Sequence, residues 1–182
     1  MEVGTVPPEP DDAEFLGELR AVGDRDSRGN EFDMEEDFIK YISVFFKTLI
    51  DIYGFNIKRE VNDGQSYSIE YNSDIVGIKL EKYRREFYVT LYKLNRPDRE
   101  INLFNLLDYV NQTKSKALES NYFRDEKNIE AYYRKQLNYI SEAIYDNYNV
   151  IKDFFSSNNY ESKVADLEMY IIKKHPELFR RT

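Results

Sequence analysis

The sequence contains no cysteine and no tryptophan, and its 182 residues include one histidine and seven glycines. Without cysteine, a disulfide framework, a cysteine-ligated zinc site and a cysteine nucleophile are all excluded. No apolar run approaches the roughly 18 residues of a membrane-spanning helix, and the first residues lack the basic flank and apolar stretch of a secretory signal. We therefore expect a cytoplasmic protein with no membrane partner.

Catalytic signatures are missing as well. The sequence has no Gly-x-Gly-x-x-Gly, no phosphate-binding loop and no Gly-x-Ser-x-Gly. Asn62-Asp63-Gly64 looks like a fragment of a calcium loop, but a turn is the better interpretation because the remaining acidic positions are absent. His175 lies at a predicted helix end, where a cation interacts favourably with the helix dipole. We expect no enzymatic activity, no cofactor and no metal site, and a carboxylate-dependent metalloenzyme is the weakest alternative.

The acidic excess is concentrated in residues 1–33. This segment holds ten acidic and three basic residues, a net charge of −7 out of the total of −8. It also contains four of the seven glycines and three of the five prolines. Low hydrophobicity combined with high net charge is typical of a disordered segment, because too little apolar surface is available to offset the ordering entropy.

Two interpretations of residues 1–33 compete: a natural acidic tail that binds a partner, and a vector-derived leader. The segment contains no Lys, Tyr or Ile, whereas the chain from Met34 onward is rich in these residues, which have AT-rich codons. Glu31-Phe32 also matches the translation of a common restriction site. We favour the leader, followed by a single α+β domain over residues 34–182. Deleting residues 1–33 should then leave the melting temperature unchanged, and a loss of several degrees would contradict this interpretation.

A helix is predicted from Asp33 to Tyr53. Asp33 can cap it, and Glu36 three residues later is typical of a helix start. Apolar residues then recur at spacings of three and four, which indicates one buried face; they are Phe38, Ile42, Phe45, Phe46, Leu49 and Tyr53. Gly54 stands where a left-handed residue commonly ends a helix.

From Phe55 the apolar period changes to two, which predicts four strands. The inward residues are Phe55, Ile57 and Val61, then Tyr67, Ile69 and Tyr71, then Val76, Ile78 and Leu80, and finally Phe87, Val89 and Leu91. Short turns between them imply an antiparallel meander with one buried and one solvent-facing side. The solvent-facing side is predicted to carry Lys58, Glu60, Glu70, Lys79, Glu81, Tyr88 and Tyr92. Residues 95–100, which include Pro97, are predicted to be a loop.

Three helices are predicted to follow the sheet. They span residues 103–118, 125–155 and 162–174, and Asp125 is the expected cap of the second one. Asn147 interrupts the apolar pattern of the second helix. This helix would span roughly 45 Å at ~1.5 Å per residue. Because that exceeds the sheet it could cover, its end must pack on another helix or another subunit.

The densest basic cluster within the predicted sheet is Arg84-Arg85, with Lys79 and Lys82 nearby. Neighbouring tyrosines could stack on nucleotide bases. Interleaved glutamates and the near-neutral charge of residues 34–182 favour a solvated turn instead, so nucleic acid is disfavoured as a partner.

Sixteen tyrosines are more than a core of this size needs, and tyrosine is enriched in protein–protein interfaces. AT-rich codon usage is the competing explanation. We predict a partner-binding surface on the solvent-facing side of the sheet and its Arg84-Arg85 turn. Its residues are Lys79, Glu81, Arg84, Arg85, Tyr88 and Tyr92.

The stretch from Asp74 to Leu94 resembles small immunity proteins encoded beside toxins in low-GC bacteria. Ile75–Leu80 leading to Phe87–Tyr92 carries most of the similarity. The resemblance implies a non-enzymatic inhibitor that blocks a toxin's active site, and it implies no particular functional residues. The alternative is a self-assembling protein of a phage or mobile element, which would form a homo-oligomer through the long helix.

Overall fold

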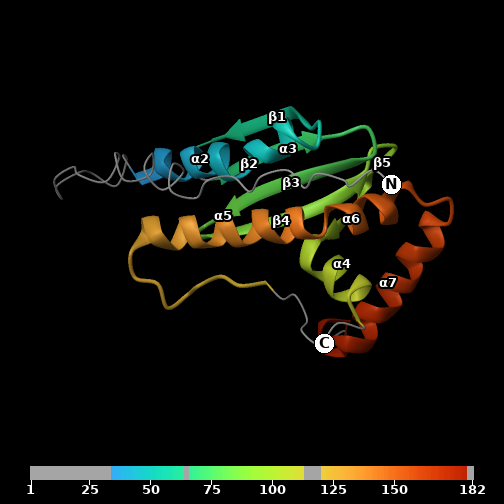
Figure 1. Ribbon diagram of the computed structural model, residues 1–182. Coiled ribbons are helices and arrows are strands. Elements are labelled where there is room, and N and C mark those ends of the chain that lie inside the picture. Colours follow the sequence, from blue (N-terminus) through green and yellow to red (C-terminus); the bar gives the residue numbers. More distant parts are fainter. Residues whose placement is uncertain (1–33, 64–65, 113–119, 180–182) are drawn as a thin grey trace, which may run out of the picture. The chain divides into compact units, whose positions relative to one another are not determined.

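Figure 1 shows the computed structural model of the chain, which describes residues 34–63, 66–112 and 120–179. The predicted acidic leader, residues 1–33, lies outside the described residues, and so do residues 113–118 of the predicted helix over residues 103–118. The described part confirms the α+β class and the antiparallel meander.

The sheet has five strands rather than the predicted four. In sequence and in space they run β1 (Asn56–Asn62), β2 (Ser66–Asn72), β3 (Val76–Tyr83), β4 (Glu86–Lys93) and β5 (Arg96–Asn102). The prediction of a loop over residues 95–100 is therefore wrong. Pro97 is tolerated because β5 is an edge strand, where a missing N–H costs no ladder hydrogen bond, and its pairing with β4 is irregular between Leu91 and Lys93.

A bulge in β1 reverses part of the predicted pattern. Ile57 pairs with Tyr71, but after the irregularity Glu60 pairs with Ile69 and Val61 pairs with the solvent-side Ser68. Directly paired residues share a face of the sheet, so Glu60 lies on the core side and Val61 on the opposite side. Ile57 is also 51% exposed. The predicted inward position of Val61 is therefore wrong because one extra residue shifts the alternation, whereas Ile57 precedes the bulge and keeps the core-side register of Tyr71, although it is exposed on the edge strand.

The predicted N-terminal helix is two helices, α2 (Met34–Phe45) and α3 (Lys47–Asp51). In a continuous helix, adjacent side chains point about 100° apart. Phe45 and Phe46 are adjacent and both buried, and the helix is interrupted at Phe46. Phe46 stacks on Tyr71 of β2 at a ring-centroid distance of 5.9 Å. Gly54 has a φ of +70°, which confirms the predicted left-handed position.

The chain continues with α4 (Leu103–Val110), α5 (Ile129–Asp146), α6 (Tyr148–Ser156), α7 (Tyr160–Lys174) and the 3₁₀ turn η1 (Pro176–Phe179). The predicted helix over residues 103–118 ends early, because Asn111 closes α4. The cap of α5 is Asn128 rather than Asp125, since the Asn128 side chain accepts a hydrogen bond from the backbone N–H of Ala131 at 2.9 Å.

The predicted long helix is divided at Asn147 into α5 and α6. Asn147 is buried, so its amide needs partners. It donates to the carbonyl of Ala143 at 2.9 Å and accepts from the amide of Asn111 at 3.3 Å. The prediction of one continuous helix over residues 125–155 is therefore wrong, but its far end does pack on another helix, since α6 contacts α7.

Helices α2 and α5 lie side by side on one face of the sheet (Figure 1). The core between them contains the ring of Phe38, whose centroid lies 5.2 Å from that of Tyr67, 5.9 Å from Phe87 and 5.9 Å from Tyr133. Helices α4, α6 and α7 gather near one end of this layer. The opposite side of the sheet, which we call the open face, points away from α2 and α5 (Figure 1).

Candidate functional site

The six predicted contact residues fall into three environments. Arg84, Arg85 and Tyr88 line one groove, whereas Lys79 and Glu81 lie beside it on the open face. The sixth residue, Tyr92, lies on the predicted side of the sheet but is only 3% exposed. The structure thus gathers half of the set around a single hollow.

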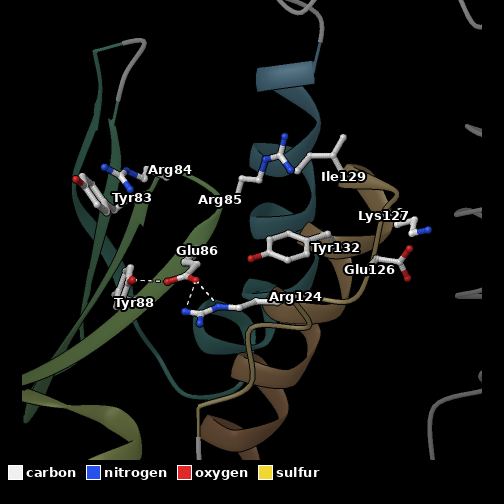
Figure 2. Close-up of a pocket in the computed structure, with 10 residues that line it drawn as sticks. All are labelled: Tyr83, Arg84, Arg85, Glu86, Tyr88, Arg124, Glu126, Lys127, Ile129 and Tyr132. Atoms are coloured by element: carbon white, nitrogen blue, oxygen red, sulfur yellow. Dashed lines mark hydrogen bonds and ion pairs between the residues drawn. The ribbon is translucent and has the colours of Figure 1, made fainter.

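This hollow, which we call the turn groove, lies between the β3–β4 turn and the segment that leads into α5 (Figure 2). Its volume is about 580 Å³. The residues that line it are Tyr83, Arg84, Arg85, Glu86, Tyr88, Arg124, Glu126, Lys127, Ile129 and Tyr132. Four of these side chains are basic and two are acidic.

The turn that forms one wall is held in place by Gln136 of α5. Gln136 is 1% exposed; its side-chain oxygen accepts from the N–H of Phe87 at 3.2 Å, and its amide donates to the carbonyl of Arg85 at 3.0 Å. Arg84 has a φ of 57°, which lets the chain reverse over two residues. The guanidinium of Arg84 lies over the ring of Tyr83, 5.3 Å from its centroid.

Both acidic side chains of the groove already have partners. The Glu86 carboxylate accepts hydrogen bonds from the hydroxyl of Tyr88 at 2.5 Å and from Nε and Nη2 of Arg124 at 2.9 and 2.7 Å (Figure 2). These hydrogen bonds, the one from Tyr88 foremost, lower the pKa of Glu86, and the same contact raises the pKa of Tyr88 to about 12. Glu126 pairs with Lys135, and this hydrogen bond lowers the pKa of Glu126.

The remaining cations of the groove lack such partners. Arg84, Arg85 and Lys127 form no ion pair with any residue in the described part of the chain. Because the two acids are neutralised by Arg124 and Lys135, the groove carries uncompensated positive charge.

Sequence reasoning missed the contributors from the α5 side of the groove, among them Arg124, Lys127 and Gln136. Arg124 and Lys127 belong to the connection before α5, which meets the turn only in the folded chain. Gln136 did carry a signal, because it stands three residues after Tyr133 and four before Ile140 on the apolar stripe of α5. A polar residue on such a stripe must find buried hydrogen-bond partners.

The charges of the open face are paired among themselves. Lys79 contacts Glu81 at 3.0 Å and Glu100 at 3.2 Å, and Lys58 contacts Glu70 at 3.3 Å. The Lys58–Glu70 contact links the neighbouring strands β1 and β2, Lys79 and Glu81 lie in the same strand, and Lys79 reaches Glu100 of β5 across β4. Lys79 and Glu81 thus serve the sheet itself, in contrast to the cations of the turn groove.

The distribution of tyrosine differs from the expectation of surplus tyrosines at the surface. All sixteen lie in the described residues, and seven are buried in the core: Tyr41, Tyr67, Tyr71, Tyr92, Tyr132, Tyr133 and Tyr160. Only Tyr83 is strongly exposed, at 59%. The single exposed tyrosine therefore lies at the rim of the turn groove.

Within the described residues, no group of three or more His, Asp or Glu side chains is arranged to hold a metal ion. His175 caps α7, as predicted: its N–H donates to the carbonyl of Ile171 at 2.8 Å, and its ring lies 3.3 Å from the Glu177 carboxylate. Among the helices of the described part, none combines the length and apolar character needed to cross a membrane.

In the turn groove, the exposed ring of Tyr83 and positive charge without an ion-pair partner in the described chain thus meet in a hollow. Comparisons with known proteins add no relative to this geometry: no family model, no curated protein and no solved structure matches the chain.

Proposed function

We propose that this chain is a non-enzymatic protein of the immunity or inhibitor type, which binds another protein through the turn groove and the adjoining open face. The observation that carries the proposal is the groove itself, which contains three cations without an ion-pair partner in the described chain and, at its rim, Tyr83, the only strongly exposed tyrosine. Arginine and tyrosine are the residue types that contribute most to binding energy at protein interfaces.

The fixed turn strengthens this proposal. Because Gln136 ties the backbone of Arg85 and Phe87 to α5, the turn is already ordered before any partner arrives. Less conformational entropy is then lost on association, so more of the contact energy contributes to affinity.

The two other candidate functions gain no support from a specific observation. Assembly through the long helix relied on an overhanging end, but Ile151, Phe154 and Phe155 of α6 are buried within the chain. A carboxylate-dependent metalloenzyme would need a cluster of ligands, and the described residues supply none.

The test compares capture of a partner from a lysate of the native host by the full chain and by two double variants. Arg84→Glu/Arg85→Glu reverses two charges in the groove, and Lys152→Glu/Lys173→Glu reverses two exposed charges on α6 and α7. We expect the first variant to lose the captured partner and the second to retain it. Equal melting temperatures for both variants and the parent chain establish that folding is unchanged.

Tyr88→Ala serves as a third variant and should also weaken capture. Tyr92→Ala, which the sequence suggested as an equivalent probe, is unsuitable because Tyr92 is buried and its loss would destabilise the sheet. Capture that survives both the Arg84/Arg85 reversal and Tyr88→Ala would exclude the turn groove as the contact.

The inhibitor part of the proposal has its own measurement. The captured protein is assayed for its activity while the purified chain is added in increasing amounts. We expect the activity to fall to zero near a one-to-one ratio. An unchanged activity would reduce the function to partner binding alone.

A further inference from the structure

We propose that the turn groove receives a short acidic segment of the partner, whose carboxylates pair with Arg84, Arg85 and Lys127. This inference rests on the proposed function and adds the chemistry of the ligand. It starts from the charge imbalance of the groove, where Glu86 and Glu126 are neutralised by Arg124 and Lys135, and three cations stay unpaired in the described chain.

The groove is arranged to hold these cations apart. Figure 2 shows Arg84 beside Tyr83 on one side of the turn and Arg85 directed toward Ile129 at the start of α5. The buried Gln136 fixes the carbonyl of Arg85, so the two arginines leave the backbone at a constant place. Guanidinium groups favour carboxylates because they can donate two parallel hydrogen bonds to the two carboxylate oxygens.

The interior of the groove suits a peptide rather than a free ion. Tyr132 is buried against the groove and Ile129 is half-buried at its edge, so apolar surface lies between the charged walls. The methylene groups of a glutamate side chain can pack on this surface while its carboxylate reaches an arginine. A volume of about 580 Å³ accommodates a few residues, not a folded domain.

The same geometry disfavours a nucleic acid strand. Polynucleotide binding needs cations spaced along the path of several phosphates. Beyond the turn, the open face presents Glu81 and Glu100, and its Lys79 is already paired with both of them. A phosphate backbone leaving the groove along the sheet would therefore meet negative charge.

The test measures binding of a fluorescein-labelled hexaglutamate peptide to the full chain by anisotropy, with hexaglutamine as the uncharged control. The chain has a net charge of −8, so its overall charge repels the acidic peptide and binding requires a local positive site. We expect hexaglutamate but not hexaglutamine to bind, and added salt to weaken the complex.

Variants then locate the site. Arg84→Gln/Arg85→Gln should weaken hexaglutamate binding by about tenfold or more, and Lys127→Gln by a smaller factor, because each removes charge-assisted hydrogen bonds. The matched control Lys152→Gln/Lys173→Gln removes the same charge from α6 and α7 and should leave binding unchanged. Equal weakening in the control would overturn the proposal.

Two competitors decide the ligand class. A hexamer of deoxythymidine that binds as tightly as hexaglutamate, with the same dependence on Arg84 and Arg85, would replace the acidic segment by nucleic acid. Inorganic phosphate that displaces the peptide at equal concentration would reduce the groove to a simple anion site. Either result overturns the inference.

Failure of this inference differs from failure of the proposed function. If hexaglutamate does not bind but partner capture still depends on Arg84 and Arg85, the groove is the contact and the ligand is not acidic. If capture is independent of both arginines, the proposed function itself fails.

Discussion

Gly77 has no room for even one additional carbon atom. A Cβ built at this position would lie 2.2 Å from Cζ of Tyr92, the residue that faces it across the β3–β4 pair. The Tyr92 ring covers the glycine, and its hydroxyl donates to Asn72 at 2.7 Å and to Glu70 at 3.1 Å. Tyr92 was predicted to face solvent, but its ring is buried because it lies over Gly77, which has no side chain to keep the ring away from the sheet.

We expect Gly77→Ala to lower the free energy of unfolding by about 1–3 kcal/mol, because the new methyl group displaces the Tyr92 ring from its hydrogen bonds. Urea denaturation measures the loss. A double-mutant cycle with Tyr92→Ala provides the control, since the cost of Gly77→Ala should shrink once the ring is absent. A cost that stays the same in both backgrounds would show that the ring is not its cause.

The buried side chain of Gln136 connects α5 to the β3–β4 turn of the groove through two hydrogen bonds. Gln136→Ala leaves the N–H of Phe87 and the carbonyl of Arg85 without their partner, which should cost about 1–3 kcal/mol of unfolding free energy. Capture of the partner should weaken as well, because the turn is no longer fixed. Asn138→Ala is the matched control on α5. The Asn138 side chain donates a hydrogen bond to Glu142 of the same helix, so its removal should change neither the stability nor the capture.

At the scale of elements, an ion pair and a hydrogen bond hold α4 against α7. The Asp108 carboxylate accepts from Nζ of Lys174 at 2.7 Å and from the hydroxyl of Tyr170 at 2.8 Å. Burial alone would raise the pKa of Asp108, but the contacts with Lys174 and Tyr170 outweigh it and the pKa lies below its ordinary value of 3.8.

This depressed pKa predicts a pH-dependent stability. Because the folded state favours the ionised carboxylate, the contribution is fully present above pH 3.8 and is lost as the pH falls through the lower folded pKa. Asp108→Asn should therefore be less stable than the parent chain at neutral pH, and the difference should narrow below about pH 4. Melting temperatures of both proteins across this range test the expectation, and a constant difference would contradict it.

The elements that sequence reasoning placed correctly have strong local signals. The period-two pattern of β2, β3 and β4 agrees with the burial of alternate residues, and Gly54 occupies its left-handed position. The misplaced boundaries share a different cause. Whether a strand tolerates Pro97 depends on whether it lies at the edge of the sheet, and the bulge in β1 shows only in its pairing with β2. Neither property can be recognised from the sequence of the strand alone.

At the scale of the whole molecule, the bend at Asn147 changes the expected assembly. A single helix over residues 125–155 would have ended in an apolar stripe without a partner in the chain, whereas Ile151, Phe154 and Phe155 of α6 are buried and α6 packs on α7. We expect the full chain to sediment as a monomer of 21.8 kDa over a wide concentration range. Association that grows with concentration and that disappears on substitution of exposed α5 or α6 residues would contradict this.

The sequence by itself determined the α+β class, the meander and the apolar faces, because these follow from periodicity and turn chemistry within short segments. It also singled out the Arg84-Arg85 turn. Only the tertiary structure decided that Arg124 and Lys127 meet this turn, that Gln136 holds it and that Tyr92 is buried. The physical reason is sequence separation: packing brings together partners that are about twenty to fifty residues apart, and no local pattern encodes which solvent-facing side chain will find one.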